Sequence, residues 1–143
     1  MTIAAVLGSK GHEVETLSGD STLMDAVRRL AAKRIGALPV MDGSRIVGIV
    51  SERDVIYCLS DKGPEALKLP VSEVMSAPAI TAEQDVGVMS ALALMTKRRI
   101  RHLPIVKGEG AICGIVSIGD LVKHRMERIE AEAEAMRAYI QGA

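Results

Sequence analysis

The stretch Ile46-Val47-Gly48-Ile49-Val50-Ser51-Glu52-Arg53-Asp54 returns later in the chain as Ile112-Cys113-Gly114-Ile115-Val116-Ser117-Ile118-Gly119-Asp120. Each copy is a short apolar run that ends in Ser-x-x-Asp. An apolar run of this length is typical of a buried strand, and Ser followed three residues later by an acidic residue is a helix start signal. The stretch therefore predicts a strand that leads directly into a helix, twice.

The repeat extends upstream of this motif. Residues 16–42 align with residues 81–107 without a gap, and one extra residue then enters the second turn. The identities include the pairs Thr16/Thr81, Asp20/Asp85, Met24/Met89, Ala26/Ala91, Arg34-Ile35/Arg99-Ile100 and Leu38-Pro39/Leu103-Pro104. An internal repeat determines the architecture of a chain, because each copy folds as the same unit. The chain is two tandem copies of one unit.

Each copy is predicted to run strand, helix, strand, strand, helix, which gives an α/β (α+β) fold of two βαββα units. The expected strands are Val14–Thr16, Leu38–Met41 and Arg45–Val50, then Ala79–Thr81, Leu103–Val106 and Ala111–Val116. Apolar residues at helical spacing predict the first helix of each copy over residues 23–30 and 88–95. A unit of about 50 residues is too small to bury a full core alone. We therefore expect the two units to pack with pseudo-twofold symmetry, with the apolar faces of their sheets meeting and clefts at the junction.

The domain boundaries follow from the helix breakers. Lys62-Gly63-Pro64 and Leu69-Pro70 interrupt the pattern, so the first unit is predicted at residues 1–62, a linker at 63–70 and the second unit at 71–125. The remaining residues 126–143 continue a helix that should run from about Ile118 to Gln141. Packing across a dimer is the predicted role of this extension, and docking onto a partner is the alternative.

Composition excludes several function classes. The 143 residues contain 18 Lys and Arg against 18 Asp and Glu, with no Phe or Trp. Nucleic-acid binders usually carry excess positive charge, and single-strand binders use aromatic side chains for stacking. No apolar run reaches the roughly 20 residues of a membrane span, and the N-terminus does not resemble a signal peptide. The sequence predicts a cytoplasmic protein that contacts neither nucleic acid nor membrane.

The repeated pattern resembles the cystathionine β-synthase-type (CBS) domain pair. The resemblance rests on Leu-Pro-Val/Ile followed by Gly-Ile-Val-Ser-x-x-Asp in both copies, and it extends to about residue 125. Val71–Ser76 resembles the segment that opens a copy, and Ile3–Leu7 is its counterpart at the N-terminus. Such pairs are regulatory modules that bind AMP, ATP, ADP, NAD or S-adenosylmethionine in the clefts between the copies. The resemblance implies a stand-alone homodimer that binds an adenine nucleotide, AMP first among them, and signals to an unknown downstream protein.

The Ser-x-x-Asp motifs carry two compatible interpretations. The structural one is helix capping, since Ser51 and Asp54 approximate a capping box, as do Ser117 and Asp120. The functional one is ribose binding, because a carboxylate at a helix N-terminus can accept both hydrogen bonds of a diol. Recurrence in both copies and the family pattern favour ribose binding by at least one Asp. The motif interiors, Arg53 and Gly119, are included in the predicted sites.

A basic pair distinguishes the two copies. Arg101 and His102 precede Leu103-Pro104, where the first copy has Gly36 and Ala37. In the family the two residues before Leu-Pro line the cleft of the other copy's Asp, and a basic pair there holds phosphate. The resemblance therefore places Asp54 opposite Arg101, His102 and Leu103, with Ala77 and Ala79 near the base. Asp120 should face only Gly36 and Ala37, with His12 as its nearest cation, so the two sites are predicted to be unequal.

No catalytic set is recognisable. The sequence has no Ser/His/Asp or Cys/His arrangement and no P-loop, which predicts a protein that is not an enzyme, requires no cofactor and holds no metal. Two alternatives to a nucleotide sensor remain open. One is a homodimerisation scaffold in which Ser-x-x-Asp serves only as a cap. The other is a redox or metal sensor that uses Cys58 or Cys113.

Overall fold

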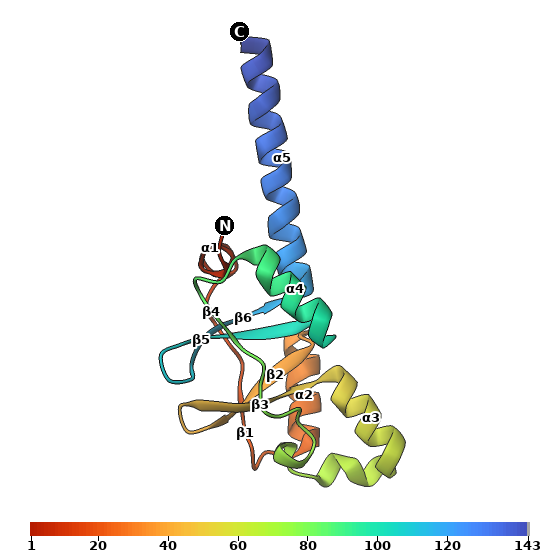
Figure 1. Cartoon of the computed structure of the whole chain (residues 1–143). Coiled ribbons are helices and arrows are strands. Elements are labelled where there is room, and N and C mark those ends of the chain that lie inside the picture. The colour runs from red at the N-terminus through yellow and green to blue at the C-terminus, as the bar shows by residue number, and fades with distance from the viewer. Residues whose placement is uncertain (143) are drawn as a thin grey trace.

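A computed structural model describes residues 1–142 and contains two similar units joined end to end (Figure 1). The predicted element order is confirmed in both. The first unit comprises β1 (Leu17–Ser18), α2 (Leu23–Lys33), β2 (Ala37–Asp42), β3 (Arg45–Ser51) and α3 (Glu52–Lys62). The second comprises β4 (Ala82–Glu83), α4 (Val88–Arg98), β5 (His102–Lys107), β6 (Ala111–Ser117) and α5 (Ile118–Gly142).

Each unit has its own three-stranded mixed sheet. The strand orders are β1-β2-β3 and β4-β5-β6, with the first pair of each sheet parallel and the second antiparallel. The antiparallel ladders shift register at equivalent places, between Val40 and Met41 and between Ile105 and Val106. The sequence repeat is thus a repeat of backbone geometry.

The first strand of each unit lies later than predicted. The expected strands at Val14–Thr16 and Ala79–Thr81 are wrong, because the paired residues are Leu17–Ser18 and Ala82–Glu83. Only two residues pair in each case, and the register is set by the side chains that bury, Leu17 at 5% and Ala82 at 9% exposure. An edge strand this short gives little alternating pattern from which its position could be read.

The segments that open the two copies are exchanged between the units. Helix α1 (Ile3–Lys10) packs into the second unit, while the 3₁₀ turn η2 (Val71–Glu73) packs into the first. Two equivalent glycines make room for them. A Cβ on Gly48 would collide with the Met75 side chain, and a Cβ on Gly114 would approach Leu7 Cδ2 to 2.7 Å. Between the units, η1 (Gly63–Lys68) adds a short helical turn to the predicted linker.

Buried side chains form two clusters instead of the shared core we expected. The first unit's cluster is completed by Val71, and the second unit's by Ile3, Val6 and Leu7. Each sheet therefore buries its apolar face against helices of its own unit and the exchanged segment. Strands β3 and β6 still contact each other, so the units meet along their sheets.

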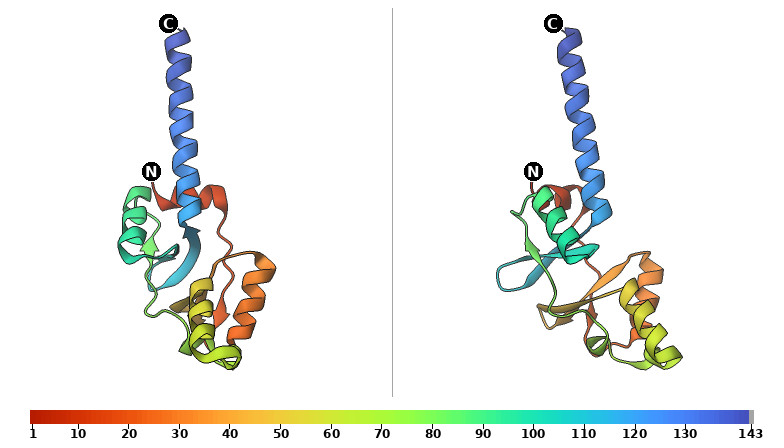
Figure 2. Two further views of the ribbon diagram at one scale, coloured as in Figure 1. Left: turned by 90° about the vertical axis from the view of Figure 1, so that its right-hand side faces the viewer. Right: turned by 45° about the vertical axis from the view of Figure 1, so that its right-hand side comes forward.

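Helix α5 confirms the predicted C-terminal helix and extends far beyond both units. Its start packs on the second unit, where Leu121 is fully buried. The rest projects away from the body in every view (Figure 2).

Candidate functional site

The helix start at α3 is a complete capping box. The Asp54 carboxylate atom Oδ2 accepts from the Ser51 backbone N at 2.8 Å and from Ser51 Oγ at 3.0 Å. The Asp54 backbone N in turn donates to Ser51 Oγ at 3.3 Å. The capping interpretation of this motif is therefore confirmed. The cap fixes the Asp54 carboxylate at the N-terminus of helix α3.

The other carboxylate oxygen of Asp54 faces the segment that opens the second copy. Ser76 Oγ donates to Asp54 Oδ1 at 3.1 Å. The Ser76 backbone is held by reciprocal hydrogen bonds with Ile49, at 3.0 Å and 2.9 Å. This oxygen thus has a neutral hydroxyl partner and keeps capacity for a further donor, since a carboxylate oxygen has two lone pairs.

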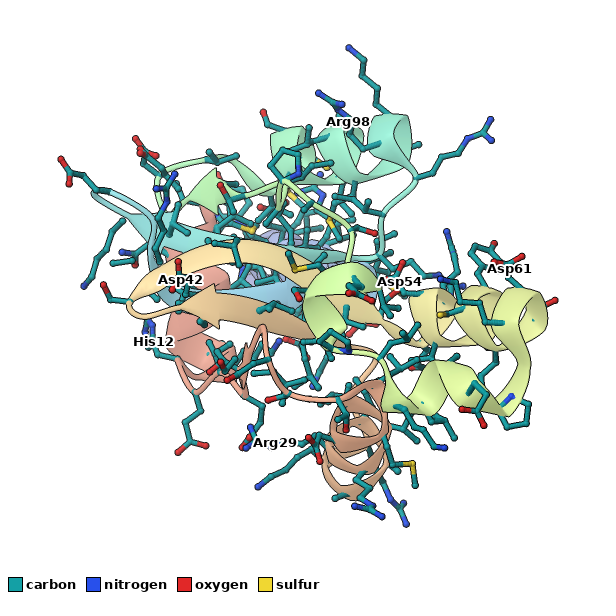
Figure 3. All side chains as sticks on the ribbon, turned by 90° about the horizontal axis from the view of Figure 1, so that it is seen from below. His12, Arg29, Asp42, Asp54, Asp61 and Arg98 are labelled. Carbon is teal, nitrogen blue, oxygen red and sulfur yellow. The ribbon has the colours of Figure 1, made fainter. Side chains whose placement is uncertain are left out.

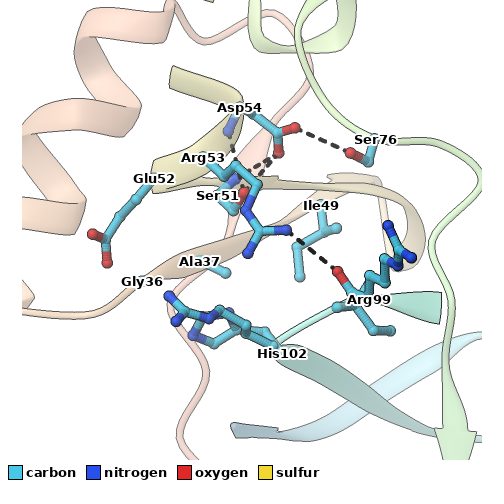
Figure 4. A pocket seen from close by; sticks show the side chains of 12 residues that line it. Gly36, Ala37, Ile49, Ser51, Glu52, Arg53, Asp54, Ser76, Arg99 and His102 are labelled. Atoms are coloured by element: carbon cyan, nitrogen blue, oxygen red, sulfur yellow. Dashed lines mark hydrogen bonds between the residues drawn. The ribbon is translucent and has the colours of Figure 1, made fainter. Parts of the chain in front are cut away.

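Basic side chains from the second unit form the opposite wall of a cavity at this point (Figure 4). Arg53 reaches across it, and its Nη1 donates to the Arg99 carbonyl at 3.4 Å. The cavity has a volume of about 190 Å³. It is lined by Gly36, Ala37, Ile49, Ser51, Glu52, Arg53, Asp54, Ser76, Arg99, Ile100, Arg101 and His102. It lies at the junction of the two units.

His102 is packed tightly in this wall. A Cβ on Gly36 would lie 2.8 Å from His102 Cε1 and 2.9 Å from Glu52 Oε1, so glycine is needed for the imidazole to sit there. Burial lowers the pKa of His102, and the Glu52 carboxylate opposes that effect only in part. The lowered pKa favours the neutral imidazole, so the arginines carry the permanent positive charge of this wall.

Seven of the residues predicted from the sequence meet in this cavity: Gly36, Ala37, Ser51, Arg53, Asp54, Arg101 and His102. Three others do not line it. Ala77 and Ala79 lie outside the lining, and Leu103 is fully buried in the core of the second unit. Gly36 and Ala37 line the Asp54 cavity together with the basic pair, and they are not among the residues around Asp120.

Sequence reasoning missed five lining residues: Ile49, Glu52, Ser76, Arg99 and Ile100. Ser76 is the one that contacts the predicted carboxylate, and only the exchange of the opening segments brings it there. The signal available for Arg99 was its position two residues before the basic pair. It ends helix α4 in a left-handed conformation with φ of 55°, as Arg34 does in the first unit with φ of 52°.

The equivalent helix start at α5 has the same cap and different surroundings. Asp120 Oδ2 accepts from the Ser117 backbone N at 2.8 Å, and the Asp120 N donates to Ser117 Oγ at 3.0 Å. Here, however, Lys10 Nζ lies 2.6 Å from the same carboxylate oxygen and also donates to the Ile115 carbonyl. Burial raises the pKa of Asp120, but the hydrogen bonds from Lys10 and Ser117 outweigh it and hold that pKa below its ordinary value.

The expectation that His12 is the nearest cation to Asp120 is therefore wrong. Lys10, from the last turn of α1, is in direct contact, and His12 Nδ1 lies instead 3.1 Å from the Cys113 carbonyl. Figure 3 shows His12 well separated from Asp54. A second cavity surrounds the ion pair and is lined by Val6, Ser9, Lys10, Asp120, Lys123, His124 and Glu127. Gly119 is not part of that lining.

Comparison with known proteins identifies the family. The model of the CBS domain matches residues 10–61 and 71–127, which covers both units. The chain belongs to the CBS domain family, as a tandem pair.

Several relatives match the chain over most of its length. It is 31% identical to CBS domain-containing protein YhcV of Bacillus subtilis, over 90% of this chain and 91% of that one. It is 34% identical to the mitochondrial CBS domain-containing protein CBSX3 of Arabidopsis thaliana, over 99% and 72%. The crystal structure of the CBS-domain protein ATU1752 from Agrobacterium tumefaciens superimposes with a TM-score of 0.83 at 32% identity, over 87% and 99%.

Two more distant structures share the fold and hold ligands. One is CBSX2 in complex with AMP, with a TM-score of 0.69 at 24% identity, over 80% of this chain and 88% of that one. The other is the CBS domain pair of MJ0100 with 5-methylthioadenosine and S-adenosyl-L-methionine, with a TM-score of 0.80 at 24% identity, over 90% and 98%. At this identity the similarity concerns the fold.

Residues 1–142 contain neither a candidate membrane span nor a candidate metal site. No helix there is both long enough and apolar enough to cross a bilayer. No group of three or more His, Cys, Asp and Glu side chains in that range is arranged to hold a metal ion.

Proposed function

We propose that this chain is a non-enzymatic regulatory module that binds an adenine nucleotide, AMP foremost, in the Asp54 cavity and signals its occupancy to a partner protein. The observation that carries the proposal is the chemistry of the two walls. The fixed Asp54 carboxylate lies on the side of the first unit, Arg53 of the same helix reaches across the cavity, and Arg99 and Arg101 line the side of the second unit. A nucleotide presents the complementary groups, a hydrogen-bond-donating ribose diol and an anionic phosphate.

The proposed contact between the ribose and Asp54 follows from the geometry of the helix cap. Asp54 Oδ1 is engaged only by the Ser76 hydroxyl in this structure, which a ribose hydroxyl can replace or join. Oδ2 stays committed to the cap, so the carboxylate does not rotate away when a ligand enters. Preorganisation of this kind lowers the cost of binding.

The proposed binding of the phosphate follows from the arginine side chains that line the cavity. Guanidinium binds phosphate through paired hydrogen bonds, and Arg53 and Arg101 approach the cavity from different units. A phosphate held by both would join the two units, which offers a route from ligand binding to a change in their arrangement. The cavity volume of about 190 Å³ is below the roughly 300–1,000 Å³ of typical ligand pockets, so a nucleotide must extend beyond it or widen it.

The Asp120 position is proposed to hold no nucleotide in the ground state. The Lys10 ammonium lies 2.6 Å from Oδ2 of Asp120 and pairs with its negative charge, which weakens this carboxylate as an acceptor for a ribose diol. We therefore infer one nucleotide per chain. The sequence predicted that the two sites bind nucleotide unequally, and we retain this prediction with a different cause. The Asp120 carboxylate is already paired with Lys10, whereas the sequence had suggested that its site lacks a phosphate contact.

Self-association is the second part of the proposal. Ile56 and Tyr57 on α3 are more than 60% exposed, and an apolar groove lined by Val27, Leu30 and Val55 lies between α2 and α3. Such surfaces are characteristic of interfaces. A homodimer would cover them.

Calorimetric titration of the purified chain with AMP, ATP, ADP, NAD and S-adenosylmethionine tests the nucleotide proposal. AMP should bind with a stoichiometry near one per chain, and the Asp54→Ala variant should bind it far less tightly. Asp120→Ala is the matched control, since it removes the equivalent carboxylate of the other unit. If none of the five ligands binds while the chain still associates with itself, the scaffold alternative is correct. Tighter binding of S-adenosylmethionine than AMP would reassign the ligand.

A further inference from the structure

Helix α5 carries a continuous apolar stripe that its own chain leaves uncovered. Along the helix only Leu121 is buried. Val122, Met126, Ile129, Met136 and Ile140 are 41%, 57%, 48%, 60% and 66% exposed. With Ala133 between them, these residues follow one another at alternating spacings of four and three, which we define as the α5 stripe.

The stripe points away from the body. Helix α5 meets α1 through the cavity that contains Asp120, His124 and Glu127. At about 100° per residue, these positions lie on the side of the helix opposite the stripe. Beyond the second unit the helix stands clear of the rest of the chain (Figure 2). Nothing in the fold explains why this face is apolar.

We propose that α5 pairs with α5 of a second copy of this chain as a parallel, in-register, two-stranded coiled coil. This deepens the proposed self-association by naming one surface that carries it and the orientation it imposes. The proposal does not depend on the nucleotide.

The spacing of the stripe supports a coiled coil. Alternation of four and three is the heptad repeat of 3.5 residues, in which apolar residues at positions a and d face the partner helix. Met126, Ala133 and Ile140 take the a positions, and Val122, Ile129 and Met136 take the d positions. The repeat continues over the whole projecting part of the helix.

The charges beside the stripe favour the parallel orientation. In a parallel coiled coil each g residue faces the e residue five positions further along the partner helix. Arg125 at g then meets Glu130 of the partner subunit, and Glu132 at g meets Arg137 of the partner subunit. Every such pair within the stripe is of opposite sign, and the twofold symmetry supplies each pair twice.

The antiparallel arrangement brings like charges together. When Met126 lies opposite Met136 of an antiparallel partner, the α5 stripes of the two helices overlap over their full length. The e positions of one helix then face the e positions of the other, and the g positions face the g positions. Glu130 and Glu132 would each face their own counterpart, and Lys123 would face Arg137 of the partner subunit. Within one helix, Glu132 pairs with Arg128 at 3.3 Å and Arg137 with Glu134 at 3.0 Å. These pairs are exposed, so the same ions remain available to a partner helix.

Disulfide trapping of the full-length chain tests the orientation. In the parallel dimer, Ile140→Cys places two thiols across one a layer, and mild oxidation should convert most of the protein to a covalent dimer. In the antiparallel dimer the two thiols would lie roughly 27 Å apart along the axis, 18 residues at 1.5 Å each. Ala135→Cys, on the outer face of the helix five residues earlier, is the matched control. Wild type measures the background from Cys58 and Cys113.

A second substitution tests the stripe itself. Ile129→Asp in the Ile140→Cys background should reduce trapping to the Ala135→Cys level and weaken association at least tenfold in sedimentation equilibrium. Ala131→Asp, on the outer face, should change neither. Trapping of Ile140→Cys no greater than that of Ala135→Cys would overturn the proposal, even if the chain dimerises through another surface. Undiminished trapping with Ile129→Asp would overturn it as well. Both readouts are independent of AMP titration, so they separate this proposal from the nucleotide proposal.

Discussion

Asp54 and Asp120 occupy equivalent positions with similar caps, and the donors that reach them from outside the cap differ. Ser76 donates a neutral hydroxyl to Asp54, whereas Lys10 places an ammonium 2.6 Å from Asp120. A hydroxyl can be exchanged for a ribose hydroxyl at little cost, because one hydrogen bond replaces another of the same kind. Displacing the ammonium separates an ion pair. This difference makes the two carboxylates chemically unequal.

The first prediction concerns Asp54. Asp54→Ala should weaken AMP at least tenfold, because a hydrogen bond to a charged group contributes roughly 1.5–3 kcal/mol and each 1.4 kcal/mol is tenfold. The free energy of unfolding should fall by only about 1 kcal/mol through loss of the cap. Calorimetry and urea unfolding measure the two effects. If stability falls while AMP affinity is unchanged, capping is the whole role of Asp54.

The second prediction concerns Arg101. Arg101→Ala should weaken AMP by about ten- to a hundredfold, from the loss of a charge-assisted hydrogen bond, and should weaken adenosine far less. Adenosine has no phosphate for the guanidinium to bind. Arg98→Ala, which changes an exposed side chain of α4 outside the cavity, is the control and should change neither affinity. Equal losses for both ligands would show that Arg101 does not bind the phosphate.

The third prediction is a pH dependence of stability that arises from His102. Burial lowers the pKa of His102 in the folded protein, so between that value and the ordinary pKa of about 6.5 the unfolded chain binds more protons. Stability should therefore fall as pH drops below about 6.5. Glu52 and Asp120 favour the charged imidazole, while Lys10 and Arg101 disfavour it.

Urea unfolding at pH 7.5 and 5.5 checks this prediction. His102→Gln keeps a similar polar side chain without the titration, so it should lose less stability than wild type over the same interval. The comparison removes contributions common to both proteins. An identical loss in the two proteins would show that His102 does not titrate with folding.

At the scale of elements, helix α1 supplies Lys10, which pairs with the carboxylate of Asp120. Lys10→Ala should free Asp120, and we expect the adenosine stoichiometry to rise from about one per chain toward two. The cost in stability should be about 1 kcal/mol or less, because the ion pair is partly exposed and such pairs contribute little. Calorimetry of the variant measures the stoichiometry, with Lys97→Ala as the control. An unchanged stoichiometry would show that Lys10 does not block the site.

Most elements could be predicted because their signals are local. The caps at Ser51 and Ser117 and the apolar spacing of α2 and α4 depend on neighbouring residues, and the repeat showed each signal twice. The exchange of α1 and η2 between units could not be predicted in this way. Ile3–Leu7 and Val71–Met75 carry no mark of which unit they complete, because either core would bury them. Gly48 and Gly114 reveal the contact only once the partner is known.

In the candidate site, too, some residues could be predicted from the sequence and others could not. Asp54, Arg101 and His102 could be placed together because the family pattern relates the two copies by symmetry. Ser76 and Lys10 could not, since both reach their carboxylates from the exchanged segments. The lowered pKa of His102 also could not be predicted, because it depends on burial of the imidazole beside Gly36 and Glu52. These features depend on contacts between residues far apart in the chain, and a single sequence does not reveal such contacts.

At the scale of the whole molecule, the two proposals concern opposite ends of the chain's architecture. The nucleotide would bind where the units meet, and α5 starts at the equivalent cap of the second unit, at Ser117. His102 contributes to the Asp54 cavity and is electrostatically coupled to Lys10 and Asp120 at the base of α5.

The last prediction uses the charges of that helix. Arg137→Glu should weaken dimerisation several-fold, because in the parallel coiled coil it sets residue 137 of each subunit against Glu132 of the other. Adding Glu132→Arg restores opposite signs across the interface and should recover most of the loss. Within each helix the double variant instead creates like-charged pairs with Arg128 and Glu134, which cost roughly 0.2–0.5 kcal/mol each. Recovery in the double variant must then come from contact between helices.

Sedimentation equilibrium of wild type, single and double variants measures the three dimer dissociation constants, and circular dichroism checks that α5 stays helical. At about 1 M salt, where the Debye length is roughly 3 Å, the differences among the three should largely vanish. A double variant weaker than the single would mean that the charges act only within one helix. In that case α5 of one subunit does not lie parallel and in register with α5 of the other.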